Sequence, residues 1–389
     1  MRVLLFHFAE LGGLGGVEVA VATLAEALNL RGWSSAIAEI APEGKPPRVL
    51  PNNIPLWSVA ASSYPKLMRP RSWASFLRST LQFRRVLQEF HPDIVHVHYP
   101  VAQCLPVVGL ASFPRNWKLI VTVHNSDIRV SPVEAPEIAP WQRRLFEHAD
   151  AITAVSQSLL DDASNKYEVF RSKAQVIHNG VGSKWFQLPL DSKPDADYVL
   201  FVGRLHPIKG VDILLHAWKS VSSAFPNTEL WIAGDGPDRQ SLEAVAATLN
   251  LSSPVRFIGR KSENELPLLY RNAKALVLPS RREGLPITLL EAGACGSICI
   301  GSRTPGIPEI IEDGVTGYVV SPESPEELAA ALLTTLQLSP SQIAQKQKDA
   351  RNRIASQFSE ARMIDSYMSL YESLVPAATV KRNGSQSSG

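Results

Sequence analysis

The stretch from Tyr198 to Ser220 reads YVLFVGRLHPIKGVDILLHAWKS, and it decides the fold of the second half of the chain. An apolar run, Tyr198 to Val202, is followed by a turn with two glycines and then by a helical pattern from Val211 onward. Short continuous apolar runs are typical of parallel strands that are covered by helices on both faces. The stretch therefore predicts the start of a doubly wound α/β domain.

The same alternation of apolar runs and helical patterns extends in both directions. Before this stretch we expect a helix at Val17 to Leu30 and strands at Val3 to Phe6, Ile94 to Val97, Leu119 to Val123, Ala151 to Ala154 and Gln175 to Ile177. After it we expect strands at Glu229 to Ala233, Val255 to Ile258, Ala275 to Leu278 and Ile298 to Ile300. These patterns predict two Rossmann-like, doubly wound domains that face a central cleft, where ligands bind at the carboxyl ends of the strands.

A polar stretch with prolines, Ser183 to Ala196, is typical of a linker between the two domains. We place the first domain at residues 1–185 and the second at residues 190–357. The final helices have no strand between them, and the last, at about residues 358–375, is expected to cross back onto the first domain. Residues 377–389 end in a polar run, Asn383 to Gly389, and are expected to be a disordered tail.

Composition and charge exclude several classes of protein. The formal net charge is only +2 over 389 residues, so no nucleic-acid partner is expected. Cys104, Cys295 and Cys299 form neither an even disulfide framework nor a zinc-binding set. No apolar run reaches the roughly 18 residues that span a bilayer, and the N-terminus resembles a strand rather than a signal peptide. We therefore expect a cytoplasmic protein, or a peripheral one on the cytosolic face of the inner or plasma membrane.

The segment of residues 44–88 departs from this average because it contains no acidic side chain. Its basic residues are Lys45, Arg48, Lys66, Arg69, Arg71, Arg78, Arg84 and Arg85, and Trp73, Phe76, Leu77, Thr80, Phe83 and Leu87 fall near helical spacing within it. Two interpretations remain open. The segment forms either an ordinary surface helix with a solvated basic face, or a basic amphipathic helix that contacts an anionic membrane or acceptor.

Residues 279–292, PSRREGLPITLLEA, contain two glutamates in different settings. Glu283 lies on a loop after a strand, and Pro286 suits the first position of the helix that follows. Glu291 falls on the helix face that we expect to be buried, together with Leu290. A buried carboxylate needs hydrogen-bond partners, which either ribose hydroxyls or a neighbouring backbone can supply.

The start of the same helix offers the free backbone N–H groups of Ile287 and Thr288, which predict an anion site. The helix rises about 7–8 Å from Pro286 to Glu291, which suits a nucleoside diphosphate sugar. In that arrangement the sugar lies near Glu283, the diphosphate at the helix start and the ribose at Glu291. For Glu283 alone, simple capping of the helix is the alternative.

The turn after the strand at Tyr198 to Val202 carries two cations. Arg204 and Lys209 flank it, directly after Gly203. Arginine binds phosphate with two hydrogen bonds and lysine acts as a point charge, so the pair suits a diphosphate leaving group. The alternative is a surface loop with two solvated bases.

A glycine-rich loop, ELGGLGGVE at residues 10–18, lies between the first strand and the first helix. Glycines allow a backbone to approach a ligand closely. The loop fails the dinucleotide spacing G-x-G-x-x-G because Glu18 stands where the third glycine belongs, and GDGPDR at residues 234–239 fails at Arg239. An NAD-binding function is therefore not favoured.

These motifs, in this order, resemble the retaining GT-B glycosyltransferases often called family 4, or group 1. The matching elements are GGVE (15–18), TVHN (122–125), NGV (179–181), Gly203-Arg204 to Lys209-Gly210, GDGP (234–237), FIG (257–259) and the pair Glu283 and Glu291. The resemblance spans nearly the whole chain, and it implies a GT-B architecture with an acceptor-side first domain and a donor-binding second domain.

The resemblance also implies roles for individual residues. Arg204 and Lys209 would bind the donor diphosphate, Glu291 the ribose hydroxyls and Glu283 the sugar. His124 would lie near the donor sugar and stabilise the reacting centre, and Arg260 would line the base pocket. Gly15, Gly16 and Glu18 would lie on the acceptor side, with Gly16 also close to the phosphate. For His124 the alternative is a histidine with only structural hydrogen bonds at a strand end.

The implied reaction transfers a hexose-type sugar from a UDP- or GDP-sugar to a glycan, a polyprenyl-linked or a small-molecule acceptor, in cell-surface polysaccharide or glycoconjugate synthesis. The resemblance also implies that the reaction is a front-face substitution that needs neither a metal ion nor a cofactor. Two departures concern the donor, because Gly182 stands where relatives carry Asp and Pro286 where many carry Gly. The alternative activities are a nucleotide-sugar epimerase or hydrolase on the same fold, and a non-catalytic nucleotide-sugar binding protein.

Overall fold

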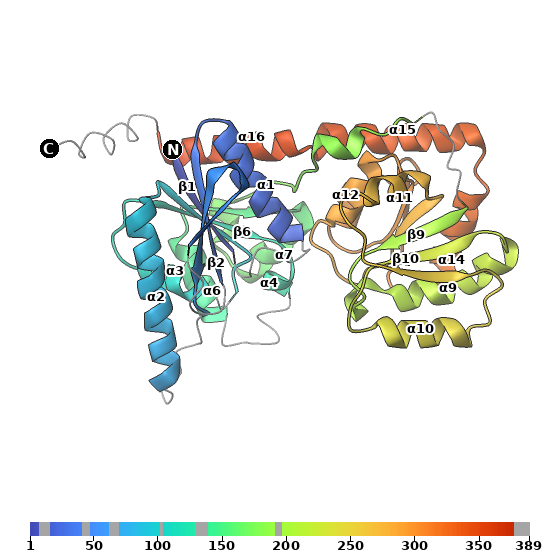
Figure 1. The fold of residues 1–389 in the computed structure, drawn as a ribbon, viewed down its shortest axis with the longest axis horizontal. Helices are drawn as coiled ribbons and strands as arrows, with labels where there is room; N and C mark the ends of the chain where they lie inside the picture. The colour runs from blue at the N-terminus through green and yellow to red at the C-terminus, as the bar shows by residue number, and fades with distance from the viewer. Residues whose placement is uncertain are drawn as a thin grey trace. The chain divides into compact units, whose positions relative to one another are not determined.

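The computed structural model describes residues 1–7, 16–40, 47–61, 70–101, 104–129, 139–190 and 197–376 (Figure 1). It divides into two compact units. The first unit comprises Met1–His178 and Met363–Gly389, and the second comprises Asn179–Arg362. The break after His178 comes earlier in the chain than the boundary at residue 185 that the sequence suggested. The tail at 377–389 lies outside the described residues.

The first unit contains an eight-stranded sheet in the order β3-β4-β2-β1-β5-β6-β7-β8. Its strands are β1 (Arg2–His7), β2 (Ser34–Ile40), β3 (Arg48–Leu50), β4 (Ile54–Val59), β5 (Ile94–His98), β6 (Lys118–Val123), β7 (Ala151–Ala154) and β8 (Ala174–Val176). All pairings are parallel except that of β3 with β4. The parallel strands are buried almost throughout, because the helices between them cover the sheet.

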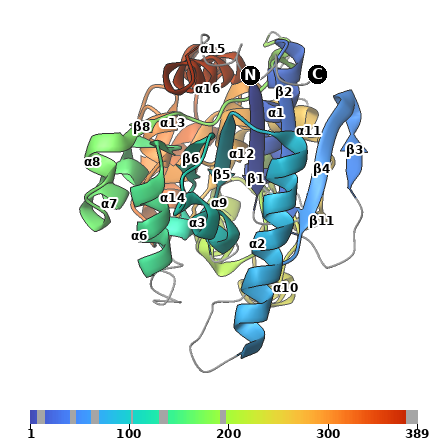
Figure 2. The ribbon, with the colours of Figure 1, turned by 90° about the vertical axis from the view of Figure 1, so that its left-hand side faces the viewer.

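The helices of the first unit follow the strands in turn. They are α1 (Gly16–Leu30), α2 (Pro70–Phe90), α3 (Leu105–Ala111), α4 (Ser126–Arg129), α6 (Ala139–His148), α7 (Gln157–Lys166) and α8 (Phe170–Lys173), with α16 (Glu360–Leu374) returning from the end of the chain. Figure 2 shows α2 as the long helix in the foreground, beside α3. Met363, Tyr367 and Tyr371 of α16 pack into the core with Leu24 and Leu28 of α1, so the last helix completes this unit.

The second unit contains a six-stranded sheet, in the order β11-β10-β9-β12-β13-β14, with every pairing parallel. Its strands are β9 (Tyr198–Val202), β10 (Glu229–Ala233), β11 (Val255–Gly259), β12 (Ala275–Leu278), β13 (Cys299–Ser302) and β14 (Gly317–Val320). Its helices are α9 (Val211–Ala224), α10 (Arg239–Thr248), α11 (Leu266–Asn272), α12 (Ile287–Ala294), α13 (Ile307–Ile310), α14 (Pro325–Leu336) and α15 (Pro340–Gln357), with short 3₁₀ turns at Ser183–Phe186 and Pro207–Lys209.

The two predicted Rossmann-like parallel sheets are confirmed, but several elements differ from the sequence interpretation. Strands β2, β4 and β14 were not predicted, and β3 adds an antiparallel edge to the first sheet. The segment of residues 44–88 is not a single helix, because β3 and β4 precede α2 within it. Among the described residues, no helix has the length and apolar character needed to cross a membrane.

Candidate active site

The turn after β9 brings the predicted cations to the carboxyl edge of the second sheet. His206 precedes the 3₁₀ turn Pro207–Lys209, and its side chain accepts a hydrogen bond from the N–H of Ile208. Gly210 then adopts a left-handed conformation, with φ +65°. A Cβ at this position would lie 2.1 Å from the carbonyl oxygen of Pro279. Only glycine therefore lets the turn approach the loop that follows β12.

Lys209 and Glu283 meet where these two loops touch. The Nζ of Lys209 donates to Oε1 of Glu283 at 2.7 Å. Glu283 is buried and Lys209 is partly exposed. An ammonium group has three donors, so Lys209 can bind Glu283 and still direct others at an anion. The structure thus joins two residues that the sequence assigned separately, one to phosphate and one to sugar.

Arg281 fixes the loop that carries Glu283. Its backbone N–H donates to the carbonyl of Ile208 at 2.8 Å, and its guanidinium group donates to both carboxylate oxygens of Asp212, at 2.9 and 2.7 Å. A two-bond contact of this kind holds both partners in one orientation. It ties the loop after β12 to the first turn of α9, so the relative positions of Lys209 and Glu283 are set by the scaffold.

The helix α12 begins one residue later than predicted. Pro286 has extended backbone angles, φ −70° and ψ 113°, so it is the N-cap residue and Ile287 is the first helical one. No side chain caps this end. The N–H groups of Ile287 and Thr288 lie in the first turn, where a helix offers no internal acceptor. The predicted anion site therefore keeps its donors, beside the loop that carries Glu283.

Glu291 has a protein partner that the sequence did not reveal. The hydroxyl of Tyr270, on α11, donates to Oε2 of Glu291 at 2.9 Å. Burial raises the pKa of Glu291 to about 7, although the hydrogen bond from Tyr270 favours the ionised form. Leu290 is fully buried as expected, whereas Glu291 itself is only partly enclosed and can still meet a ligand.

Two predicted donor-site residues are exposed and are not drawn into this network. Arg204 follows β9 and Arg260 follows β11, and neither has a hydrogen bond or ion pair with another described residue. Glu263, three residues after Arg260, lies close enough to Glu291 to contribute to its raised pKa. The loop between β11 and α11 therefore passes near Glu291 in the second unit.

The carboxyl edge of the first sheet carries a group of buried histidines. His7 ends β1, His98 ends β5 and His124 follows β6, and all three are buried. Nδ1 of His98 lies 3.2 Å from Nε2 of His124, so one imidazole donates to the other. The backbone N–H of His124 also donates to the carboxylate of Asp127, at 3.0 Å. The ring and main chain of His124 are thus both held in place.

His98 and His124 are neutral at physiological pH. Burial, with His7 as a smaller cause, lowers the pKa of His124 to about 3, and burial lowers the pKa of His98 well below its ordinary value. His96 lies two residues before His98 on β5. Its ring nitrogens form hydrogen bonds with the hydroxyls of Tyr371 and Thr122, at 2.7 and 2.6 Å, so its role is to hold the fold together. His124 can therefore offer a dipole or a hydrogen bond to a ligand, but no positive charge.

The acceptor-side glycine loop is described only in part. Gly15 lies outside the described residues. Gly16 is the first residue of α1 and is exposed, and Glu18 lies half-buried in the first turn of that helix. A carboxylate there is favoured by the positive end of the helix dipole. Among the described residues, no group of three or more His, Cys, Asp or Glu side chains is placed to hold a metal ion.

Sequence reasoning missed several residues of these networks, among them His7, His98, Tyr270 and Arg281. A signal existed for His98, because the run IVHVH at residues 94–98 places polar rings in an otherwise apolar buried strand. None existed for Tyr270, whose partner lies 21 positions away on another helix. Arg281 was quoted within its motif, but its contact with Asp212 depends on the approach of two loops.

Two family models match the chain, one on each unit. "Glycosyltransferase Family 4" matches residues 14–184, and "Glycosyl transferases group 1" matches residues 187–354. Among curated proteins, a glycogen synthase of Mycobacterium tuberculosis is 26% identical over 89% of this chain and 88% of its own length. A D-inositol 3-phosphate glycosyltransferase of Mycolicibacterium smegmatis is 28% identical, over 92% of this chain and 82% of its own.

Solved structures show the same fold. A sucrose-phosphate synthase from Thermosynechococcus elongatus superposes with a TM-score of 0.80 at 21% identity, and covers 97% of this chain and 99% of its own. The Anabaena protein HepE, in complex with UDP, superposes with a TM-score of 0.76 at 19% identity, over 96% and 100% of the two chains. Taken with the two family models, these likenesses show that the chain belongs to the family 4, group 1 glycosyltransferases of GT-B fold.

Proposed function

We propose that this transferase moves a hexose-type sugar from a nucleoside diphosphate to an acceptor hydroxyl with retention of anomeric configuration. The observation that carries the proposal is the ion pair between Lys209 and Glu283, at 2.7 Å, on the loop that leads into α12. It places a cation, a buried carboxylate and a helix N-terminus together at the carboxyl edge of a parallel sheet. Ligands of open α/β sheets bind at that edge.

Lys209 and the start of α12 would stabilise the charge of the leaving diphosphate. Hydrogen bonds to charged groups contribute roughly 1.5–3 kcal/mol each, and donors that are already fixed lose no energy in reorganising. Glu283 would hold Lys209 in place and face the hydroxyls of the donor sugar. Arg204, which is exposed beside the same turn, would add a second cation when the diphosphate is bound.

Glu291 would bind the ribose through its ionised carboxylate. Tyr270 occupies Oε2, which leaves Oε1 for a ribose hydroxyl. Neighbouring structures support a uridine donor, because HepE structures contain UDP in one case and UDP-glucose in another. Our proposal includes both UDP- and GDP-sugars as donors, with Arg260 beside the uracil or guanine base.

The acceptor hydroxyl would attack from the same face as the leaving phosphate, and that phosphate would take its proton. His124, neutral and held by His98, would donate or accept a hydrogen bond at the donor sugar. A glycan, polyprenyl-linked or small-molecule acceptor is proposed, for synthesis of a cell-surface polysaccharide or glycoconjugate. A cytoplasmic location accords with the three free, buried cysteines.

A donor panel with and without acceptors tests the proposal. Purified protein is incubated with UDP- and GDP-hexoses, each alone and with monosaccharide, inositol and polyprenyl-linked acceptors, and released nucleotide is measured. We expect release to depend on one acceptor class, and the proton coupling constant of the product to show the anomer of the donor. Release that never depends on acceptor would indicate a hydrolase, and an inverted product would contradict retention.

The same assay tests the requirement for metal. We propose that Lys209, Arg204 and the N-terminus of α12 stabilise the negative charge of the leaving diphosphate without a metal ion. An excess of chelator is therefore expected to leave the turnover rate unchanged. Abolition by chelator, with recovery on addition of Mg²⁺ or Mn²⁺, would overturn this part of the proposal.

A further inference from the structure

The outward side of α2 carries large apolar side chains that the fold leaves uncovered. Trp73, Leu77 and Leu81 are 43, 55 and 63% exposed. They are spaced by four residues, so they form one stripe along the helix. Scattered exposed hydrophobic residues are normal on a protein surface, but a contiguous stripe marks an interaction site.

The exposed apolar stripe is separate from the side of α2 that faces the core. The side of α2 that packs on the first unit contains Ser79, Phe83, Val86 and Phe90, all of which are buried. At 100° per residue, the centre of the exposed stripe lies almost opposite the centre of that buried side. The helix therefore has two apolar sides, and only one of them is needed to hold it on the sheet.

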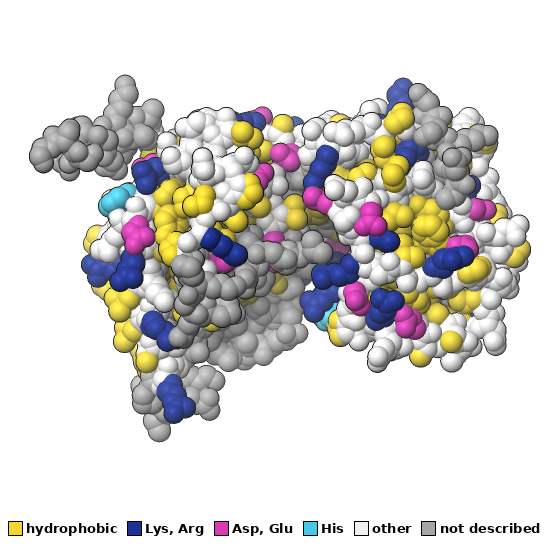
Figure 3. All heavy atoms as spheres, viewed as in Figure 1, with side chains coloured by type: hydrophobic (Ala, Val, Ile, Leu, Met, Phe, Trp, Pro, Cys, Tyr) yellow, Lys and Arg dark blue, Asp and Glu magenta, His cyan; other side chains and the backbone are white. Residues whose placement is uncertain are grey.

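Arginines border the stripe. Arg84 and Arg85 are exposed on the same outward half of the helix, and Arg71 and Arg78 are exposed nearby. No acidic residue occurs between Glu43 and Glu89, and Glu89 itself accepts a hydrogen bond from Trp57. Figure 3 shows hydrophobic and basic side chains next to each other along this helix, at the lower left. The local charge is strongly positive, although the net charge of the chain is only +2.

We propose that the outward face of α2, formed by Trp73, Leu77, Leu81, Arg84 and Arg85, docks on an anionic phospholipid bilayer. The apolar stripe would enter the boundary between headgroups and acyl chains, with the indole at the level where tryptophan is favoured. The arginines would lie among the lipid phosphates, and their long aliphatic stems would cover apolar surface. Charge complementarity favours a bilayer over a protein groove. An apolar stripe bordered by arginines matches a surface in which negatively charged headgroups lie directly above an apolar layer of acyl chains.

Vesicle sedimentation tests this docking directly. We expect the full-length protein to sediment with vesicles of 30% phosphatidylglycerol in phosphatidylcholine, and to remain in solution with phosphatidylcholine alone. The double variants Leu77→Ser/Leu81→Ser and Arg84→Glu/Arg85→Glu are each expected to bind roughly tenfold more weakly or worse, since each basic residue near an anionic surface contributes measurably to binding. Raised salt is expected to weaken wild-type binding, because exposed charges are screened over about 8 Å at physiological ionic strength.

Matched controls come from the second unit. Leu268 on α11 is 55% exposed, as Leu77 is, so Leu268→Ser removes an equally exposed leucine elsewhere. Lys219 and Lys348 are exposed, and Lys219→Glu/Lys348→Glu makes the same change of charge as the arginine variant. Both controls are expected to bind vesicles as the wild type does. Equal losses in the controls and in the α2 variants would overturn the proposal, because general charge or surface hydrophobicity would then explain binding.

Trp73 provides a local readout. Brominated lipids quench a tryptophan that enters the bilayer, so vesicles with brominated phosphatidylglycerol are expected to quench part of the wild-type fluorescence. The conservative variant Trp73→Phe should keep vesicle binding and lose that part of the quenching. Absence of wild-type sedimentation, quenching that Trp73→Phe does not change, or a dimer in solution that Leu77→Ser/Leu81→Ser dissociates would each overturn the proposal. The donor site plays no part in these measurements, so their failure leaves the proposed transferase activity untouched.

Discussion

At the scale of single residues, the contact between Lys209 and Glu283 is the sharpest test of the donor site. Lys209→Ala removes a fixed donor to the leaving diphosphate, and we expect kcat to fall by about 10²-fold, as for the loss of one strong charge-assisted hydrogen bond. Glu283→Gln keeps a hydrogen-bond acceptor for Lys209 but removes the charge, so a smaller loss is expected than for Glu283→Ala. Steady-state kinetics with the active donor measure both.

Circular dichroism melting is the control for these variants. Leu268→Ser, at an exposed position of the same unit, should retain full activity. If Lys209→Ala turns over at a near-normal rate with a normal melting curve, the assignment of Lys209 to the diphosphate is wrong.

The hydrogen bond from Tyr270 to Glu291 predicts a dependence on pH. Burial raises the pKa of Glu291 to about 7, and the hydrogen bond from Tyr270 opposes that rise. Only the ionised carboxylate accepts hydrogen bonds from ribose at full strength, so the KM for the donor should decrease as pH rises through about 7. Tyr270→Phe removes the opposing contact and should move this transition to higher pH. Donor KM between pH 5.5 and 8.5 measures the shift, and Glu291→Gln should abolish the transition in either background. A profile that Tyr270→Phe leaves unchanged would contradict the role of Tyr270.

The sequence allowed us to single out residues that belong to a recognisable local motif. Glu283 and Lys209 were assigned to a donor site because a loop before a helix and a turn after a strand have recognisable sequences. Their direct contact could not be found, because it depends on Gly210 allowing the turn to approach the carbonyl of Pro279. His98 and Tyr270 were missed for the same reason, since their partners lie on other strands or helices.

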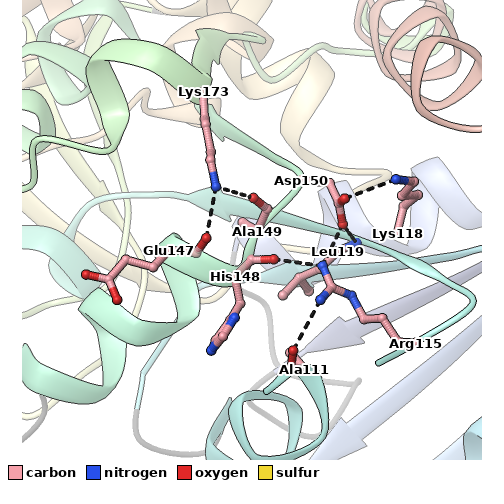
Figure 4. Close-up of polar contacts among 9 residues, drawn as sticks. All are labelled: Ala111, Arg115, Lys118, Leu119, Glu147, His148, Ala149, Asp150 and Lys173. Atoms are coloured by element: carbon pink, nitrogen blue, oxygen red, sulfur yellow. Dashed lines mark hydrogen bonds and ion pairs between the residues drawn. The ribbon is translucent and has the colours of Figure 1, made fainter. Parts of the chain in front are cut away.

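At the scale of helices and strands, the amino ends of β6 and β7 are held together by one half-buried carboxylate, that of Asp150 (Figure 4). Asp150 accepts hydrogen bonds from Arg115 at 2.7 Å, from the N–H of Leu119 at 2.8 Å and from Lys118 at 3.2 Å. Burial opposes its ionisation, but the contacts with Leu119 and Arg115 outweigh it, so the pKa of Asp150 lies below its ordinary value. This group joins the sheet to α3, because Arg115 also donates to the carbonyl of Ala111.

The lowered pKa fixes the sign of the pH effect. The ionised form is favoured in the folded state, so its contribution to stability is complete above the unfolded pKa of about 4 and is lost as pH falls through the lower folded value. We expect Arg115→Ala to reduce the free energy of unfolding by about 2–3 kcal/mol at pH 7, and by less at pH 3. Urea unfolding at the two pH values measures this difference.

Lys173→Ala is the matched control, because Lys173 donates only to the carbonyls of Glu147 and Ala149 in Figure 4. Its effect on stability should be the same at both pH values. An Arg115→Ala effect that does not shrink in acid would show that the contacts with carbonyl groups, and not the charge of Asp150, hold this edge.

For β2 and β4, two of the strands that the sequence did not reveal, the sequence signal is weak for a physical reason. β2 has the sequence SSAIAEI, in which small and polar residues dilute the apolar run, and β4 contains Pro55. Proline is tolerated near a sheet edge, and β4 lies one strand from the edge, paired to short β3. Tertiary burial therefore decides these strands more than local preference does. The long buried runs at β1, β6 and β12 were predicted because propensity and burial agree there.

At the scale of the whole molecule, the residues proposed to hold the donor and the histidines proposed for the reacting centre belong to different units. Lys209, Glu283 and Glu291 lie in the second unit, whereas His98 and His124 lie in the first. Each group is built on the carboxyl edge of its own parallel sheet. This division predicts that nucleotide binding and turnover can be separated by mutation, because Glu291, Arg204 and Lys209, which we propose for ribose and diphosphate, all lie in the second unit.

We therefore expect His124→Ala to lower kcat by about 10²-fold or more, as for loss of a preorganised hydrogen bond at a reacting centre, while the Kd for UDP or GDP is unchanged. His98→Ala should act in the same direction but less strongly, because His98 reaches the reaction only by holding the ring of His124. Glu291→Gln should show the reverse pattern, with a higher Kd. Titration calorimetry with the nucleotide and steady-state kinetics together measure the separation.

Since His124 is neutral, the loss in His124→Ala should be the same from pH 6 to pH 8. A loss that grows in acid would mean that a protonated imidazole takes part, and a weakened nucleotide Kd in His124→Ala would place that residue in nucleotide binding instead.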